Sequence, residues 1–237
     1  MTSLQRLGGS CAIVVGLSYV LIGITYFLLP SAQRAGGGGP ASFYPSYAES
    51  PLFARLLNWE FALGSLFAIC AVLAVSEAIR SAGEGLARWT ANLAIIGFAV
   101  NAIDAFRALA LQPAFAAAYV AGDASTKASI AATGVTSLDP DGWLVFGAVG
   151  AWALASSVLI LRTPTFSRVL GYVGVATGVL YWLVVAGNVL GIPVLISVAA
   201  GLGGVVAAPI WFIGLGTSML RGPATALAPS RSATALR

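Results

Sequence analysis

The sequence predicts an all-α polytopic membrane protein, a bundle of six transmembrane helices with both termini in the cytoplasm. Three observations support this fold class. Of the 237 residues, 59% are hydrophobic and 8% are charged, whereas a soluble domain carries about 25% charged residues. Six segments are apolar over the roughly 20 residues that cross a bilayer. The arginines collect in the connections that would lie on one side of the membrane.

Each of the six predicted spans is bounded by a turn or a charged connection. The spans cover residues 7–29, 56–79, 89–111, 142–161, 168–190 and 196–220. The first is longer than the apolar core of about 7–15 residues in a signal peptide, so we expect it to persist as a helix. Pro209 predicts a kink in the last span. The Pro-, Ala-, Ser- and Thr-rich stretch 222–237 predicts a disordered cytoplasmic tail.

The basic residues divide unequally between the two sides of this predicted bundle. One set of connections comprises the N-terminus, residues 80–88, residues 162–168 and the tail, and it contains Arg6, Arg80, Arg88, Arg162, Arg168, Arg221, Arg231 and Arg237. The opposite set contains only Arg34, Arg55 and Lys127. Because cytoplasmic loops carry the excess of Lys and Arg, this bias predicts a multi-pass protein of the bacterial inner (plasma) membrane with both termini cytoplasmic.

The two long connections, 30–55 and 112–141, are expected on the outer side. The first contains a run of glycines, which disfavours regular structure and predicts a solvated linker, with a partner-binding loop as the alternative. In the second, residues 114–121 and 125–132 predict short interfacial helices. The sequence Asp139-Pro140-Asp141-Gly142 predicts a turn that caps the fourth span, because the other ligands of a calcium loop are missing.

One stretch of the third span places an acid and a base within the hydrocarbon, Asn101-Ala102-Ile103-Asp104-Ala105-Phe106-Arg107. Charged side chains in membrane helices face the bundle interior and pair with one another. From a rise of 1.5 Å per residue, Asp104 lies about 10 Å and Arg107 about 6 Å below the outer boundary. Glu60 in the second span and Asn188 in the fifth lie near the same boundary. We therefore expect one polar cluster in the outer leaflet.

Two interpretations of this cluster remain open. It can be a clamp that fixes helix packing, with Asp104 paired to Arg107 within the helix and Arg107 paired to Glu60 across helices. It can instead be an outward-facing polar site for a ligand. A proton path across the membrane is not favoured, because the inner halves of the spans carry no acid except Glu77 near the end of its own helix.

Several function classes are excluded by composition. The chain has no His, which removes the commonest metal ligand and the usual base of a nucleophilic pair. Cys11 and Cys70 each lie within an apolar span and are expected as small buried side chains, and we expect no metal site. The basic residues are scattered singly, so nucleic-acid binding is not expected. We expect no enzyme, since only Glu60 and Asp104 could serve as an acid–base pair.

Aromatic residues within the spans leave open whether the bundle binds a lipophilic cofactor. Trp152, Tyr181, Trp182 and Trp211 could line a pocket for a bound lipid, quinone or pigment, although aromatic side chains at such positions more often serve packing or face lipid. No cofactor is evident from the residues themselves. The expected partners are membrane lipids and other membrane subunits or a second copy of the chain.

The last third of the chain carries a family resemblance. The residues concerned are Arg162-Thr163-Pro164-Thr165-Phe166-Ser167-Arg168-Val169-Leu170-Gly171-Tyr172-Val173-Gly174 with Gly178, Pro209-Ile210-Trp211-Phe212-Ile213-Gly214-Leu215-Gly216, and Leu220-Arg221. In these glycine spacings and helix ends, residues 142–221 resemble the DUF4386-like family of uncharacterised bacterial six-span membrane proteins. The resemblance implies a six-helix fold and supplies no catalytic residues. The third span departs from it, with Asp104 and Arg107 where an Arg–Glu pairing is often found.

Two functions are compatible with these observations. The first is an accessory or scaffold subunit of a larger membrane complex, for which an energy-transducing assembly is one candidate. The alternative is a small transporter or a protein that binds a lipophilic ligand, with its polar site around Asp104, Arg107 and Glu60. Absent catalytic constellations and long outer connections favour the first.

Overall fold

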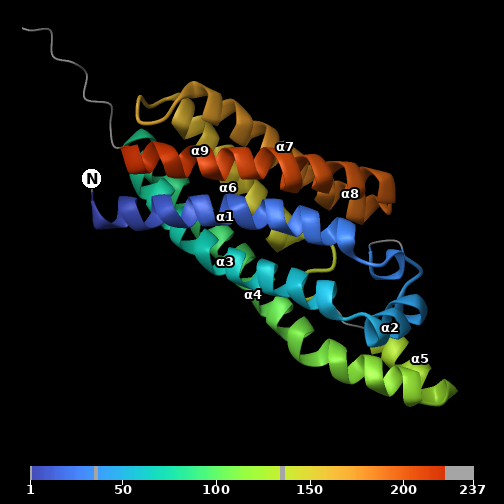
Figure 1. Ribbon diagram of the computed structural model, residues 1–237. Coiled ribbons are helices and arrows are strands. Elements are labelled where there is room, and N and C mark those ends of the chain that lie inside the picture. The colour runs from blue at the N-terminus through green and yellow to red at the C-terminus, as the bar shows by residue number, and fades with distance from the viewer. Residues whose placement is uncertain (1, 35–36, 134–136, 222–237) are drawn as a thin grey trace, which may run out of the picture.

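The computed structural model describes residues 2–34, 37–133 and 137–221, so the predicted tail 222–237 lies outside the described residues. Figure 1 shows a bundle of long helices, and no strand occurs in these ranges. Six helical segments are long and apolar enough to cross a membrane. They are α1 (Ser3–Leu28), α3 (Leu52–Ile79), α4 (Glu84–Ala121), η3 (Trp143–Ala148) with α6 (Val149–Leu161), α7 (Arg168–Leu190), and α8 (Pro193–Ala200) with η4 (Gly201–Ala207) and α9 (Ala208–Arg221). The predicted all-α six-helix architecture is confirmed.

The third span differs most from its predicted bounds. We expected it to end at residue 111, but α4 passes through Pro113 and continues to Ala121. The stretch 114–121 is therefore part of α4 and not a separate interfacial helix. Residues 125–132 do form a short helix of their own, within α5 (Ala124–Thr133). In Figure 1 the last turns of α4 project beyond the bundle at the end opposite the N-terminus.

The prediction of a solvated linker at 30–55 is wrong. A short turn, η1 (Ser31–Gln33), is followed by α2 (Pro40–Glu49), in which Tyr44 and Tyr47 are buried. Gly39 has φ +70° at the start of α2, a conformation that favours glycine. The aromatic residues that follow recur at helical spacing, so that one face of α2 is apolar and packs inward.

A second hydrophobic core lies at this end of the molecule, separate from the core of the bundle. Its buried residues are Leu29, Tyr44, Tyr47, Ala54, Ala116 and Ile130. The rings of Tyr44 and Tyr119 stack with their centroids 5.3 Å apart. We call α2, residues 112–121 of α4 and α5 the helical cap. The cap and its neighbours are visible in Figure 1 at the end remote from the N-terminus.

The bundle core is centred on aromatic side chains of the fourth and sixth spans. Trp152 and Trp211 are 0% and 1% exposed, and their ring centroids lie 5.2 Å apart in an edge-to-face arrangement. Phe212 packs against both rings. Tyr181 is also buried, whereas Trp182 is exposed. The ring contacts give Trp152, Trp211 and Phe212 a packing role.

Glycines bring α1 and α9 together closely enough for backbone contact. A Cβ atom placed on Gly216 would lie 2.6 Å from the carbonyl oxygen of Gly9, a separation that real Cβ atoms do not adopt. Helices in lipid gain no hydrophobic free energy by associating. Small residues stabilise such crossings because they allow the two backbones to pack closely. The α1–α9 contact therefore joins the first and last spans into a closed bundle.

Irregular helix precedes Pro209, where a kink was expected. The π-helical stretch η4 ends at Ala207, and α9 begins one residue before the proline. Because Pro209 has no N–H to donate to the carbonyl of Val205, the regular hydrogen-bond ladder cannot continue through this turn. A second π-helical stretch, η3, opens the fourth span directly after the turn at Gly142.

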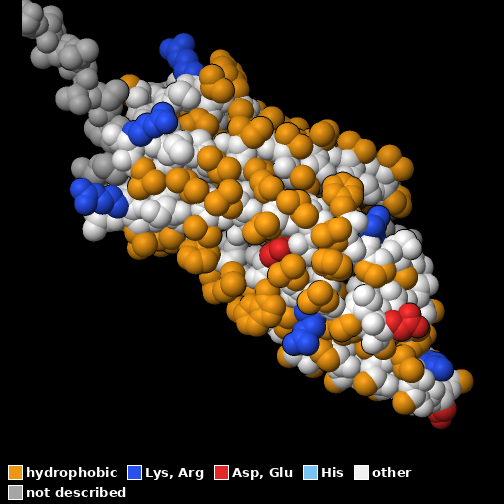
Figure 2. All heavy atoms as spheres, in the orientation of Figure 1, with side chains coloured by type: hydrophobic (Ala, Val, Ile, Leu, Met, Phe, Trp, Pro, Cys, Tyr) orange, Lys and Arg blue, Asp and Glu red, His pale blue; other side chains and the backbone are white. Residues whose placement is uncertain are grey.

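The surface agrees with this arrangement of spans. Hydrophobic side chains dominate the middle of the face in Figure 2, and charged side chains collect toward its two ends. At the end that carries the N-terminus the visible charged groups are basic. An isolated acidic group lies within the apolar region of this face. The apolar middle is the part that would contact lipid.

Candidate functional site

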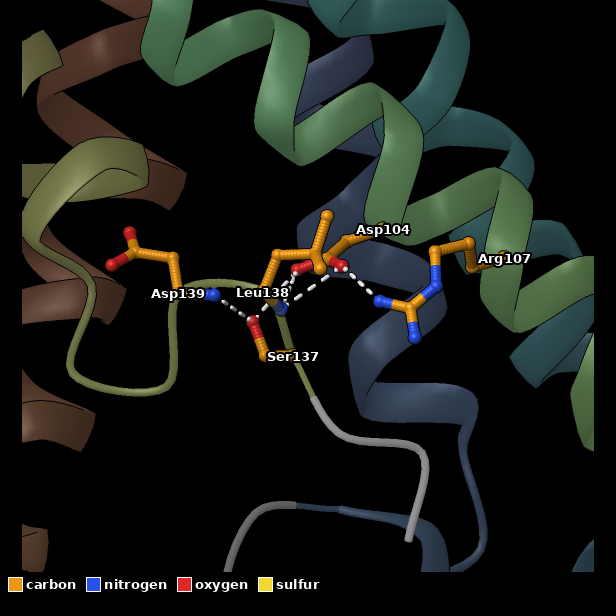
Figure 3. A network of polar contacts seen from close by, with 5 residues as sticks. All are labelled: Asp104, Arg107, Ser137, Leu138 and Asp139. Carbon is orange, nitrogen blue, oxygen red and sulfur yellow. Dashed lines mark hydrogen bonds and ion pairs between the residues drawn. The ribbon is translucent and has the colours of Figure 1, made fainter. Parts of the chain in front are cut away.

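The carboxylate of Asp104 fastens the connection before the fourth span to the side of α4 (Figure 3). Both carboxylate oxygens accept from the backbone N–H of Leu138, at 3.1 and 2.9 Å. The hydroxyl of Ser137 donates to Oδ2 at 2.7 Å. An ionised carboxylate that accepts several such bonds is a strong anchor. The carboxylate oxygens of Asp104 are therefore already hydrogen-bonded to Ser137 and Leu138 of the same chain.

Asp139 continues this network toward the fourth span. Its N–H donates to the hydroxyl of Ser137 at 3.1 Å, and its Oδ2 accepts from the N–H groups of Leu144 and Val145 at 2.7 and 2.8 Å. These two N–H groups belong to the first turn of η3 and would otherwise lack partners. The predicted turn and helix cap at Asp139 are confirmed. A continuous series of contacts thus links α4, the connection and the start of the next span.

Arg107 completes the network on the other side of Asp104. Its Nη1 donates to Asp104 Oδ1 at 3.3 Å, which confirms the expected pairing within the helix. The Asp104 side chain is 18% exposed and that of Arg107 is 39% exposed. The expected ion pair between Arg107 and Glu60 is not formed: among the described residues Arg107 pairs with Asp104, and Glu60 faces α1 instead.

Glu60 interacts with the first span. Its Oε1 accepts from the hydroxyl of Thr25 at 2.9 Å, while its Oε2 is buried without a hydrogen-bond partner among the described residues. Glu60, Ser65 and Asn101 line one small cavity of about 10 Å³ between α1, α3 and α4. That volume is at the lower limit for one water molecule. Asn101 donates to the hydroxyl of Ser65 at 2.8 Å and so ties α4 to α3.

Asn188 lies apart from the other predicted residues. Its side-chain amide donates to the backbone carbonyl of Asp141 at 3.2 Å. This contact holds the end of α7 against the turn that opens the fourth span. The predicted single cluster is thus divided into three groups: Asp104 with Arg107, Glu60 with Asn101, and Asn188 with the Asp141 turn.

Apart from Glu60 Oε2, the polar side-chain atoms described above form contacts within α4, between helices or with connections. The sequence did not identify Thr25, Ser65, Ser137 or Leu138 as partners. Thr25 and Ser65 could have been found, because they lie in apolar spans at the depths of Glu60 and Asn101. The role of Leu138 could not, since it donates through its backbone. No group of three or more His, Cys, Asp or Glu residues that could hold a metal occurs among the residues searched, 2–34, 37–133 and 137–221.

The fold and this site define an integral, multi-pass membrane protein whose intramembrane polar groups tie helices and connections together. The chain belongs to the DUF4386 family: the model of the Domain of unknown function (DUF4386) matches residues 14–218. This confirms the resemblance noted in the last third of the sequence and extends it over most of the chain. Comparisons with curated proteins and with solved structures gave no match.

Proposed function

We propose that this protein is a non-catalytic accessory or scaffold subunit of a larger membrane complex, and that partners dock on its helical cap. The observation that carries the proposal is the cap's separate hydrophobic core, built around Tyr44 and Tyr47 and distinct from that of the bundle. A folded element beyond the spans offers a surface that lipid does not cover. The side chains of Asn101, Asp104 and Asn188, in contrast, hold helices and connections of the bundle together.

One exposed apolar residue marks a face of the cap on which docking can be tested. Val120 is 54% exposed near the end of α4, roughly 13 Å beyond residue 111 at 1.5 Å per residue. Its side chain contributes little to either core, so a substitution there changes the surface and leaves the fold intact. An exposed position at the other end of the molecule, Ser81 in η2 (Arg80–Ala82), provides the matched control.

The test is extraction of the tagged full-length chain from native membranes in a mild detergent, followed by size-exclusion chromatography. We expect elution with other membrane proteins, at a mass well above that of a 24.0 kDa chain in a detergent micelle. Val120→Asp should release the partners, whereas Ser81→Asp should retain them. Elution of the wild-type chain alone, as a stable monomer, would contradict the proposal.

We further propose that the protein resides in the plasma membrane with both termini in the cytoplasm and the cap outside. Among the described residues Arg6, Arg80, Arg88, Arg162, Arg168 and Arg221 lie in the N-terminal, 80–88, 162–168 and C-terminal segments, which share one side of a six-span bundle. The positive-inside rule assigns that side to the cytoplasm.

A transporter or lipophilic-ligand binder with its site around Asp104, Arg107 and Glu60 is the second candidate. It is favoured by one observation, the buried Glu60 Oε2 that no described residue satisfies. In cells in which the wild type supports uptake of a compound, Glu60→Gln and the pair Asp104→Asn and Arg107→Gln should each abolish that uptake. Unchanged uptake in these variants would reject this function.

A further inference from the structure

Two cysteines that are distant in sequence meet within the bundle. Cys11 of α1 and Cys70 of α3 are both free thiols, and their side chains lie within hydrogen-bonding reach of each other. They are the only two cysteines of the chain. The helices that carry them lie side by side (Figure 1). The fold therefore pairs the two thiols, although each was expected only as a small buried side chain.

The register of the two helices explains why the thiols meet. α1 and α3 are consecutive spans and run antiparallel. Gly8, near the start of α1, faces Ala74, near the end of α3. Cys11 follows Gly8 by three residues, which is about one helical turn. Cys70 precedes Ala74 by four residues, again about one turn. Because residues three and four apart share a helix face, this step along the crossing brings the two cysteines opposite each other.

The two backbones approach closely at this crossing. A Cβ atom on Gly8 would overlap the Cβ of Ala74, and it would lie 3.4 Å from the carbonyl oxygen of Cys70 itself. A disulfide requires Cα atoms within about 7 Å of each other, a separation that only closely packed helices provide. The glycine thus brings the helices near enough for a cross-link one turn further along.

The surroundings favour a disulfide over a metal complex. Cys11 is 6% exposed and Cys70 is half-buried, and both pack in the apolar core of the bundle. At 1.5 Å per residue they lie about 12–14 Å from the start of α1 and the end of α3. A metal held by two thiolates would bring charge into this region, where charge is costly. A disulfide is neutral and needs no further ligand.

We propose that Cys11 and Cys70 form a reversible disulfide that locks α1 to α3, with a membrane quinone as the oxidant. Two S–H bonds break and one S–S bond forms. The quinone takes up the two protons and the two electrons and becomes a quinol. A quinone suits this depth because it dissolves in lipid, whereas water-soluble oxidants such as oxidised glutathione stay outside the hydrocarbon. The site does not depend on the proposed scaffold role.

The test counts free thiols in the purified full-length chain after reconstitution into liposomes. Because the chain has two cysteines, a maleimide that carries a polyethylene glycol chain attaches twice to the reduced protein. It does not attach to the disulfide form. The maleimide is added after denaturation in SDS, and a non-reducing gel separates the products. Three oxidants are compared: decylubiquinone and copper–phenanthroline, which enter lipid, and oxidised glutathione, which does not.

Two variants serve as controls. Cys70→Ser retains one thiol and cannot close an internal disulfide. The relocated pair combines Cys70→Ala with Leu73→Cys, which moves the second thiol by less than one turn to a surface of α3 where Leu73 is 46% exposed. This variant keeps the number of thiols and nearly their depth, and it changes the direction in which one of them points.

We expect decylubiquinone to abolish both maleimide additions in the wild type without producing a dimer, and dithiothreitol to restore them. Oxidised glutathione should leave both thiols free, and the relocated pair should stay reduced with the quinone. The oxidised wild type should have a Tm higher by about 5 °C or more than the reduced protein, because the disulfide constrains the unfolded chain between residues 11 and 70.

Several outcomes would overturn the proposal. Thiols that stay free with decylubiquinone would do so, even if copper–phenanthroline oxidises them, because contact without reaction is not a redox site. Equal oxidation by glutathione would show access from water, and a linked dimer would show that the thiols pair between chains. Equal oxidation of the relocated pair would show that the register is irrelevant. The decisive measurement uses the wild type, so it does not depend on the folding of a variant.

Discussion

Leu138 donates its backbone N–H to both carboxylate oxygens of Asp104, 34 residues earlier in the chain. Through this contact an intramembrane acid, which would be costly in lipid, becomes the fixed point of a connection between two spans. Asp139, the next residue, caps the following helix. The depth of Asp104 in α4 thereby sets where the fourth span begins.

Removal of the Asp104 charge should release this connection. In Asp104→Asn the amide N–H₂ cannot accept from Leu138, so we expect a loss of about 1–2 kcal/mol of stability and faster proteolysis between residues 122 and 142. Limited proteolysis and thermal unfolding in detergent measure the two effects. Asp141→Asn is the control, because Asp141 contacts Asn188 through its backbone carbonyl, which the substitution keeps. Equal sensitivity of both variants would contradict an anchoring role for Asp104.

Two buried serines should respond in opposite ways to the same substitution. The hydroxyl of Ser76 accepts from the indole N–H of Trp152 at 3.2 Å, so Ser76→Ala leaves a buried donor unsatisfied and should cost about 1–3 kcal/mol. The Ser157 hydroxyl is buried without a partner among the described residues, so Ser157→Ala should be neutral or stabilising. Chemical denaturation in detergent compares them, and a similar loss in both would show that packing dominates.

The α1–α9 crossing should not tolerate one added methyl group. In Gly216→Ala the new Cβ meets the backbone oxygen of Gly9, which cannot rotate away, so we expect a loss of about 1–3 kcal/mol. Gly204→Ala is the control, since a Cβ there has nothing within 4 Å. Thermal unfolding measures the difference. A Gly216→Ala protein as stable as the control would mean that the two helices separate without cost.

The proposed orientation can be measured by cysteine labelling. In a background without Cys11 and Cys70, single cysteines are placed at the exposed positions Ala48 in the cap and Ser81 at the other end. A maleimide that does not cross membranes should label Ala48→Cys in intact cells and Ser81→Cys only after permeabilisation. The reverse pattern would place the cap in the cytoplasm.

The sequence allowed the spans to be predicted because lipid imposes a simple rule, about 20 apolar residues per crossing. It did not reveal that α4 continues through Pro113, since a proline within an exposed segment ordinarily ends a helix. The length and hydrophobicity rules that predicted the spans also carry no information on the cap, which lies outside them. Its aromatic residues Tyr44 and Tyr119 come from two connections, predicted as a solvated linker and a short interfacial helix, and their stacking depends on a contact distant in sequence.

The candidate site was predicted in part for a similar reason. The pairing of Asp104 with Arg107 follows from helical spacing alone, and it is present at 3.3 Å. Glu60 was assigned to Arg107 from its depth, but depth does not fix the direction in which a side chain leaves its helix. Glu60 leaves α3 toward Thr25 of α1.

Separate cores in the bundle and the cap have a consequence for how such a chain can vary. No buried residue is common to the two cores, and α4 is a continuous helix that contributes to both. Substitutions in one module therefore need few compensating changes in the other. The cap can therefore diverge in sequence while the bundle stays unchanged. Chimeric proteins in which α4 joins the bundle of one protein to the cap of another should fold for the same reason.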